Sequence, residues 1–333
     1  MTRVAVMGTG SWGTTFAVVL ADAGAKVTMW GRRREICADI EHHHRNSEYL
    51  GDLPLPQTIS ASPHAAEVLD GVDMVVLAVP AQTLRGVLTE WRALLPPSSV
   101  LISLMKGVEL GTHLRMSQVI GDVTGAGADR IAVVSGPNLA HEIAMRQPTA
   151  TVVACADLDV AEGVAAGCST PYFRPYTNTD IVGVELGGAV KNVIGLAVGI
   201  AEGMGLGDNA KASIITRGLA ETGRLGEALG ADAVTFAGLA GMGDLVATCA
   251  SPLSRNRTFG VQLGQGLSVA EVVARTKRTA EGVKSCRPIL ELAQANDVEM
   301  PITEQVVAAV HESLPVQELA RRLLSRARKT ERA

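Results

Sequence analysis

The sequence has few aromatic residues, no close pair of cysteines and no excess of basic charge. Aromatic side chains make up 3% of the 333 residues, and the five cysteines are scattered without a Cys-x-x-Cys spacing. An odd number of distant cysteines argues against a disulfide framework and a zinc ribbon, so reduced, buried thiols are expected. The formal net charge of −4 argues against a nucleic-acid-binding protein, which needs a basic surface to contact phosphates.

The composition indicates a folded chain of about two domains, each of about 150 residues. With 47% apolar and 19% charged residues, the chain can bury a substantial core. The N-terminal run lacks the charged segment, apolar segment and cleavage site that together make a secretory signal. We therefore do not expect this segment to be a secretory signal.

The first half of the chain alternates short apolar strands with helical stretches. Six strands are continuously apolar, as in a parallel sheet buried on both faces, and span residues 3–7, 26–30, 74–79, 99–104, 131–135 and 149–154. The strand pattern ends with residues 173–177. Helical stretches are predicted at residues 12–23, 34–45, 81–95 and 138–145. This alternation predicts an α/β fold whose N-terminal domain, residues 1–180, is a doubly wound, Rossmann-like parallel sheet.

From residue 181 to residue 333 the pattern is helical and contains no convincing strand. Helices are predicted at residues 185–204, 211–229, 235–247, 268–276, 285–296 and 303–312, which together form an all-helical C-terminal domain. Residues 186–206 are apolar enough to span a bilayer but contain Lys191 and Glu202, and a charge inside a bilayer is costly. A helix buried in the protein, without membrane insertion, is expected. The arginine-rich tail from Arg321 is expected to be a solvated helix end.

A glycine-rich turn follows the first predicted strand and opens a helix. Gly8, Gly10 and Gly13 fit the pattern G-x-G-x-x-G. In this context the glycines permit a tight turn, a close backbone approach to a pyrophosphate and close helix–strand packing. The helix N-terminus offers free N–H groups to the anion. The sequence therefore predicts a dinucleotide-binding site.

The end of the second strand indicates which dinucleotide is preferred. An acidic residue, which would bind a ribose 2′-hydroxyl, is missing there, and Arg32, Arg33 and Arg34 follow. A guanidinium group suits a 2′-phosphate better than a neutral diol. NADP(H) is the predicted preference, and NAD(H) remains possible.

Two lysines are candidates for the chemistry. Lys106 lies just past a strand end, and the turn of residues 136–140 follows the next strand, so both are expected to face the cofactor cleft. Lys191 lies in the apolar helix, on a stripe of glycines at every fourth position that leaves room for a ligand or a closely approaching backbone. Burial favours the neutral form of an ammonium group, so this amine is expected to exchange a proton near neutral pH.

A polar cluster in the second half suits a small phosphate ester. Ser254, Arg255 and Asn256 offer hydroxyl, guanidinium and amide donors side by side, although Ser254 is equally plausible as a helix cap. No metal site is predicted, because three consecutive histidines at residues 42–44 point in different directions on a helix.

The motifs GTGSWG, SLMKG, SGPNLA, ELGGAVKNV, GMGDL and SRNR occur in this order along the chain. With this ordered set the sequence resembles the bacterial NAD(P)-dependent glycerol-3-phosphate dehydrogenases over nearly its whole length. The resemblance implies reversible reduction of dihydroxyacetone phosphate to sn-glycerol 3-phosphate, a precursor for phospholipid synthesis, by a cytoplasmic homodimer.

The resemblance also implies residue roles. Lys191 is the implied proton donor or acceptor, with Lys106 and Asp244 beside it. The implied cofactor contacts, besides the glycine turn, are Ser11, Trp12, Arg32, Arg33, Lys106, Ala140, Arg255, Thr279 and Glu281. The implied substrate contacts are Lys106, Gly136, Asn138, Lys191, Asp244, Ser254, Arg255 and Asn256. Asn138 departs from the family pattern, in which many members carry Ser or Thr there.

Two alternatives stay open from the sequence. Another two-domain enzyme, of the 3-hydroxyacid or ketopantoate dehydrogenase type, would combine the same domains with a lysine but prefer a carboxylate substrate. A nucleotide-sensing protein without catalysis would bind the cofactor without turnover. Neither alternative explains the phosphate-binding cluster as well.

Overall fold

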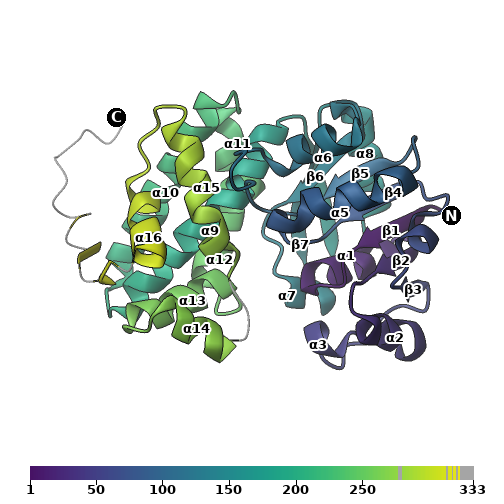
Figure 1. Ribbon diagram of the computed structural model, residues 1–333, viewed down its shortest axis with the longest axis horizontal. Helices are drawn as coiled ribbons and strands as arrows, with labels where there is room; N and C mark the ends of the chain where they lie inside the picture. Colours follow the sequence, from purple (N-terminus) through teal and green to yellow (C-terminus); the bar gives the residue numbers. More distant parts are fainter. Residues whose placement is uncertain (277–279, 313, 317, 320–321, 323–333) are drawn as a thin grey trace.

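The computed structural model describes residues 1–276, 280–312, 314–316, 318–319 and 322. A sheet domain and a helical domain lie side by side along the longest axis of the molecule (Figure 1). The sheet has the strand order β3-β2-β1-β4-β5-β6-β7-β8. Its strands are β1 Arg3–Met7, β2 Lys26–Trp30, β3 Ile59–Ser62, β4 Met74–Leu77, β5 Val100–Ser103, β6 Ile131–Ser135, β7 Thr149–Cys155 and β8 Phe173–Asn178.

All seven expected strands are present, and two features differ from the prediction. The edge strand β3 was not predicted, because its sequence ISAS is short and only Ile59 is buried. The sheet is also not purely parallel, since β7 pairs antiparallel with β6. The connection between them contains only the five-residue helix α7, Ala140–Ala144, which is too short for the usual helical crossover between parallel strands. The chain therefore turns back at the carboxyl end of β6.

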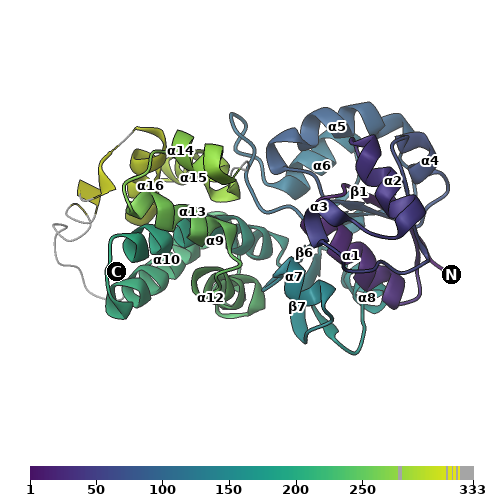
Figure 2. The same ribbon diagram turned by 90° about the horizontal axis from the view of Figure 1, so that it is seen from below.

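Helices cover both faces of the sheet, as in a doubly wound fold (Figure 2). The predicted helix over residues 81–95 is divided by short 3₁₀ turns on either side of α5, Leu84–Trp91. The other helices of this domain are α1 Ser11–Asp22, α2 Arg34–His43, α3 Ser47–Leu50, α4 Ala65–Leu69, α6 Met116–Thr124 and α8 Leu158–Gly167. Of these, α3, α4, α6 and α8 were not predicted.

The second domain is built around one long helix, α9, Ile181–Gly203. Around it lie α10 Asp208–Ala228, α11 Ala233–Ala237, α12 Asp244–Ala250, α13 Arg255–Gly264, α14 Val269–Thr276, α15 Glu281–Gln294 and α16 Pro301–His311. The predicted helix over residues 235–247 is wrong in detail: it is broken into α11, a π-helical turn over Leu239–Gly243, and α12. Helix α13 was not predicted.

The glycine stripe of α9 accommodates a protein backbone and not a ligand. A Cβ at Gly199 would lie 2.1 Å from the carbonyl oxygen of Arg257, and one at Gly203 would lie 2.1 Å from that of Val261. Helix α13 therefore crosses α9 almost backbone to backbone. By length and composition α9 is the one helix among the described residues that could cross a membrane, and 83% of its most apolar window is buried inside this fold.

The sheet ends at Asn178 and α9 begins at Ile181, so the expected boundary after residue 180 falls in this short connection and stays a prediction. The five cysteines are free and buried. Apart from Arg322, the basic tail from Arg321 lies outside the described residues.

Candidate active site

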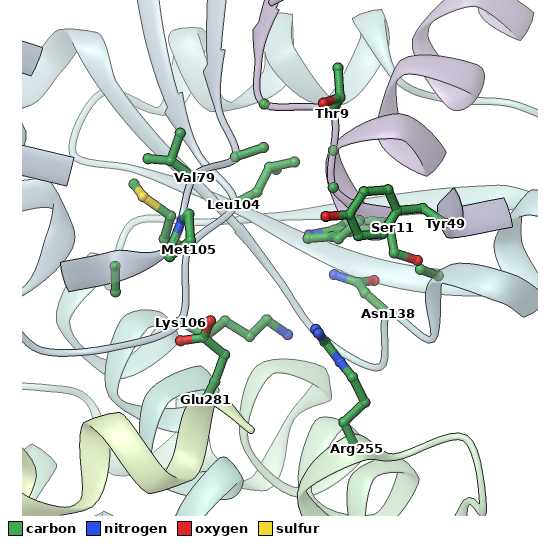
Figure 3. A pocket seen from close by; sticks show the side chains of 18 of the residues that line it. Thr9, Ser11, Tyr49, Val79, Leu104, Met105, Lys106, Asn138, Arg255 and Glu281 are labelled. Atoms are coloured by element: carbon green, nitrogen blue, oxygen red, sulfur yellow. The ribbon is translucent and has the colours of Figure 1, made fainter. Parts of the chain in front are cut away.

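A cleft of about 630 Å³ lies between the two domains, at the carboxyl ends of the parallel strands. Its upper wall in Figure 3 is the glycine turn and the ends of β4 and β5, and its lower wall is formed by α13 and the start of α15. Strand order reverses between β1 and β4, and ligands of doubly wound sheets bind at such a switch point.

The glycine turn has the geometry expected for a pyrophosphate cradle. Gly8 has a φ of +142°, and a Cβ there would lie 2.4 Å from the carbonyl oxygen of Ala78. A Cβ at Gly13 would lie 2.6 Å from the carbonyl oxygen of Gly8, so α1 packs tightly on the turn. A Cβ at Gly10 would meet no protein atom within 4 Å. That open face precedes the first free N–H groups of α1, where an anion binds favourably.

Two buried polar groups at the cleft have no partner among the described residues. They are the indole Nε1 of Trp12 and both amide atoms, Nδ2 and Oδ1, of Asn138. A buried donor or acceptor without a partner costs about 1–3 kcal/mol, so such groups point to a polar ligand. Ser11 and Ala140 line the same part of the cleft. These residues fit a bound dinucleotide.

The two arginines expected at the ribose differ in their surroundings. The guanidinium of Arg33 forms a two-pronged ion pair with Glu48, at 2.6 and 2.8 Å, and also donates to the hydroxyl of Tyr49. Arg32 also lines the cleft, is exposed, and forms no such ion pair with any described residue. A 2′-phosphate would therefore compete with Glu48 for Arg33.

The segment after α2 contributes residues that the sequence motifs did not single out. Tyr49 lines the cleft opposite Arg255 (Figure 3). Asn46 is fully buried, and its Nδ2 donates to the carbonyl oxygen of Thr9 and to the hydroxyl of Thr14, at 3.0 and 2.8 Å. This amide holds the glycine turn in place. A single asparagine in a loop carries no local signal of such a role.

Three charged groups from both domains meet at the base of the cleft. Lys106, which follows β5, donates to Oδ2 of Asp244 at 2.5 Å. Lys191 of α9 donates to the other oxygen, Oδ1, of the same carboxylate and to the hydroxyl of Thr248, the latter at 2.7 Å. The side chain of Asp244 is 1% exposed, whereas those of Lys106 and Lys191 are 14% and 12% exposed. One buried carboxylate thus orients two ammonium groups that both reach the cleft.

The environment lowers the pKa of Lys106 to about 8. Burial is the main cause, and the positive charge of Lys191 acts in the same direction, while Asp244 opposes both. An amine with a pKa in this range can hold a proton at neutral pH and release it under mildly basic conditions.

Close helix packing places Asp244 in this position. A Cβ at Gly187 of α9 would lie 2.4 Å from the carbonyl oxygen of Ala240 in the π-helical turn. A Cβ at Gly241 would lie 2.2 Å from the carbonyl oxygen of Phe236. These glycines let the turn approach α9 and start α12 with Asp244 against Lys191. Single π-helical turns are frequent at functional sites.

In the predicted phosphate cluster, Ser254 and Asn256 form hydrogen bonds within the fold, whereas Arg255 is exposed to the cleft. Ser254 caps α13, since its Oγ accepts from the N–H of Arg257 at 3.3 Å. Asn256 is buried, donates to Asn192 and accepts from the N–H of Gly282. Arg255 is exposed and extends into the cleft toward Asn138 (Figure 3).

The remaining expected residues also lie at the cleft, with one outside the described residues. The carbonyl of Gly136 accepts from Lys106 at 3.0 Å, and burial raises the pKa of the Glu281 carboxyl. Thr279 lies outside the described residues. Within the described residues no group of three or more histidines, cysteines, aspartates or glutamates could hold a metal ion, and a metal-free site stays a prediction.

Two family models match the chain. The model described as NAD-dependent glycerol-3-phosphate dehydrogenase N-terminus matches residues 3–161, and the corresponding C-terminus model matches residues 180–321. The glycerol-3-phosphate dehydrogenase [NAD(P)+] of Streptomyces coelicolor is 62% identical over 99% of this chain and 98% of its own length. That of Thermobifida fusca is 61% identical over 100% and 99%.

Solved structures give the same result. The glycerol-3-phosphate dehydrogenase of Coxiella burnetii aligns with a TM-score of 0.93 and 37% identity, over 98% of this chain and 99% of that one. A ketopantoate reductase from Ralstonia eutropha aligns with a TM-score of 0.59 at 16% identity, over 96% and 100%, which shows a shared fold only. The chain therefore belongs to the NAD-dependent glycerol-3-phosphate dehydrogenase family.

Proposed function

We propose that this chain catalyses the reversible reduction of dihydroxyacetone phosphate to sn-glycerol 3-phosphate by a nicotinamide dinucleotide. The observation that carries this proposal is the cluster of Lys106, Asp244 and Lys191, which joins the two domains beside a dinucleotide-type glycine turn. Family membership supports the substrate, because the curated relatives are named for glycerol 3-phosphate.

The dinucleotide supplies the hydride when it is bound, and the protein supplies the proton and the electrostatic stabilisation. Lys191 Nζ donates a proton to the substrate oxygen as negative charge develops on it. Lys106 places a second positive group near the same oxygen, which stabilises that charge in a site of low polarity. Asp244 holds both amines, and Thr248 accepts a further hydrogen bond from Lys191. In the reverse direction Lys191 accepts the proton from the alcohol.

The phosphate of the substrate is proposed to lie between the domains, near Arg255. This guanidinium is exposed in the cleft and faces Asn138, whose amide has no partner among the described residues. A charge-assisted hydrogen bond to phosphate contributes about 1.5–3 kcal/mol. Ser254 can donate its hydroxyl proton while capping α13, Asn256 lines the surrounding wall, and Gly136 holds Lys106 through its carbonyl.

The preferred dinucleotide is proposed to be NADP(H), with NAD(H) also accepted. Arg32 is the main proposed contact to a 2′-phosphate, and Arg33 would contribute after partial release from Glu48. Trp12, Ser11, Ala140, Glu281 and Thr279 are proposed as further cofactor contacts. We also propose a cytoplasmic homodimer that supplies glycerol phosphate for phospholipid synthesis.

One assay tests the reaction. NADPH consumption is measured with dihydroxyacetone phosphate and, separately, with ketopantoate, and both are repeated with NADH. The proposal expects turnover with the phosphate ester and little with the carboxylate. Preference for ketopantoate, or NADPH binding without turnover on either ketone, would reject it.

A further inference from the structure

Residues 106–115 form a strap that leaves the sheet domain after β5, contacts the helical domain and returns to α6 (Figure 2). The strap is closed by a β-bridge between Val108 and Arg115. Val108 is fully buried in the hydrophobic core of the helical domain, although the strap belongs to the sheet domain. Lys106, the first residue of the strap, is one of the two ammonium groups of the cleft.

The far end of the strap is fixed by a buried carboxylate from the opposite domain. Glu185 of α9, with a side chain 3% exposed, accepts from Arg115 Nη1 at 2.5 Å. Its Oε1 also accepts from the N–H of Ser117 at 2.7 Å, and its Oε2 accepts from the Ser117 hydroxyl at 2.6 Å. Ser117 lies in the first turn of α6, so Glu185 satisfies a free N–H of that helix. A single side chain of α9 therefore binds both the strap and the helix that follows it.

Gly188 lies on α9 between Glu185 and the base of the cleft. Gly188 lies three residues later, and a Cβ there would be 3.3 Å from Cγ of Lys106. Lys191 lies three residues further and contacts Asp244, which also binds Lys106. Residues three apart are neighbours on a helix surface, so Gly188 adjoins both Glu185 and Lys191, which are themselves separated by about a third of a turn around the axis. The position of Glu185 against Arg115 and Ser117 thus sets how α9 lies along the strap that carries Lys106.

Apart from Lys106 and Val108, the other contacts of the strap are more exposed or lie within the sheet domain. Glu109 accepts from Arg85, which belongs to the same domain. His113 contacts Glu291 of α15 at 3.0 Å, but their side chains are 30% and 38% exposed. Exposed pairs contribute little to stability, whereas removal of one partner from a buried pair leaves an unpaired buried charge and is strongly destabilising.

We propose that Glu185 is a positioning residue for the reaction, which holds the strap so that Lys106 meets Asp244 and Lys191 across the domain junction. This inference rests on the proposed function. Glu185 contacts neither the cleft lining nor the cluster at its base, so its effect on turnover acts through the strap.

The test compares Glu185→Gln with a matched control on the same helix. Glu202 of α9 also pairs with an arginine, Arg257, at 2.7 Å, but both partners belong to the helical domain. For wild type, E185Q and E202Q we would measure kcat and KM for dihydroxyacetone phosphate, the Kd of NADPH, the melting temperature and the pH profile of kcat. E185Q is expected to lose about ten- to 100-fold in kcat, since small misplacements of reacting groups have effects of this size. E202Q is expected to stay within about twofold of wild type.

Two readouts separate positioning from a general loss of stability. The Kd of NADPH should stay unchanged in E185Q, because the glycine turn, Arg32 and Arg33 lie on other segments. Lys106 faces Asp244 of α12 and Lys191 of α9, and its lowered pKa depends mainly on burial. Loosening of the strap would hydrate Lys106 and move the alkaline limb of the pH profile upward.

The outcomes are distinct. Absence of turnover in wild type would reject the proposed function itself. An active wild type with the same kcat and pH profile in E185Q as in E202Q would overturn the role of Glu185. If E185Q does not fold, Ser117→Ala is used instead, because it removes one hydrogen bond to the same carboxylate. A lower kcat in S117A with an unchanged Kd of NADPH would support the proposal. An unchanged kcat would overturn it.

Discussion

The sheet domain encloses one end of the cleft with the backbone of its glycine turn and contributes one amine, that of Lys106, to the base, whereas the helical domain contributes two of the three charged groups there. In the sheet domain the glycine turn and the start of α1 form the wall, and the carbonyl of Gly136 accepts a hydrogen bond from Lys106. In the helical domain Lys191 projects from α9, and Asp244 and Arg255 are the first residues of α12 and α13, which pack against α9. A backbone cradle tolerates changes in side chains that do not fill it, but a cluster of buried charges depends on every member. The comparison predicts that substitutions in the helical half have the larger effects on turnover.

Replacement of the α9 amine should have the largest effect. Lys191→Ala removes the proposed proton donor, and general acid catalysis contributes about 10²- to 10⁴-fold to such rates. We expect kcat to fall by this factor while the Kd of NADPH, measured by fluorescence titration, stays unchanged. Lys211→Ala on α10, a half-buried lysine paired with Asp208 outside the cleft, is the control. Turnover near the wild-type level in K191A would remove Lys191 from the mechanism.

Loss of the shared carboxylate should be nearly as severe. Asp244→Asn leaves Lys106 and Lys191 beside each other without a counter-charge, and removal of one partner of a buried pair costs about 3–5 kcal/mol. Asp244 raises the pKa of Lys106 against the effect of burial, so the variant should lower this pKa below about 8. The pH profile of kcat is then expected to lose its plateau at a lower pH. An unshifted alkaline limb would show that Lys106 does not control it.

Arg255→Ala should act on substrate binding more than on chemistry. Loss of a charge-assisted contact of about 1.5–3 kcal/mol predicts a rise in KM for dihydroxyacetone phosphate of about ten- to 100-fold. The control is Arg287→Ala, an exposed arginine on α15. Steady-state kinetics at saturating NADPH measure both constants, and an unaffected KM would place the phosphate elsewhere.

Substitutions in the sheet half should change cofactor choice and leave the proton chemistry intact. Arg32→Ala is expected to reduce the NADPH/NADH ratio of kcat/KM by about tenfold or more. Glu48→Gln frees Arg33 from an exposed ion pair, so the same ratio should rise by about two- to fivefold. Measuring kcat/KM with NADPH and with NADH for both variants tests whether the ratio falls in one and rises in the other. A fall of the ratio in E48Q would mean that Glu48 supports the cofactor site.

The smallest expected effect concerns stability. Burial raises the pKa of Glu221 of α10 to about 7, above an unfolded value of about 4.3. A raised carboxyl pKa stabilises the fold fully below the unfolded value, and this contribution is lost as the pH rises through 7. The free energy of unfolding of wild type should therefore fall, relative to that of Glu221→Gln, as the pH rises from 5 to 8. Glu227→Gln, exposed on the same helix, should show no such trend.

The sequence was informative where a signal is local. The strands of the sheet, the glycine turn and Lys191 could be predicted, because apolar runs, glycine spacing and a charge in an apolar helix are each visible in one segment. The strand β3 and the antiparallel β7 depend on neighbouring strands and on the length of a connection, so they could not. The resemblance assigned Asp244 to the site, but its contact with both lysines depends on glycine packing between α9 and a π-helical turn. Likewise, Glu48 beside Arg33 is a tertiary contact that no motif shows.

The shared carboxylate of Asp244 has a consequence for how fast substrate arrives. Two ammonium groups and one carboxylate leave a net positive charge at the base of the cleft whenever both lysines are protonated, and Arg255 and Arg32 add to it at the rim. A concave, low-polarity wall focuses such a field outward, so doubly charged phosphate esters are drawn in from solution although the whole chain carries a charge of −4. Added salt should slow their capture well before it disturbs the fold.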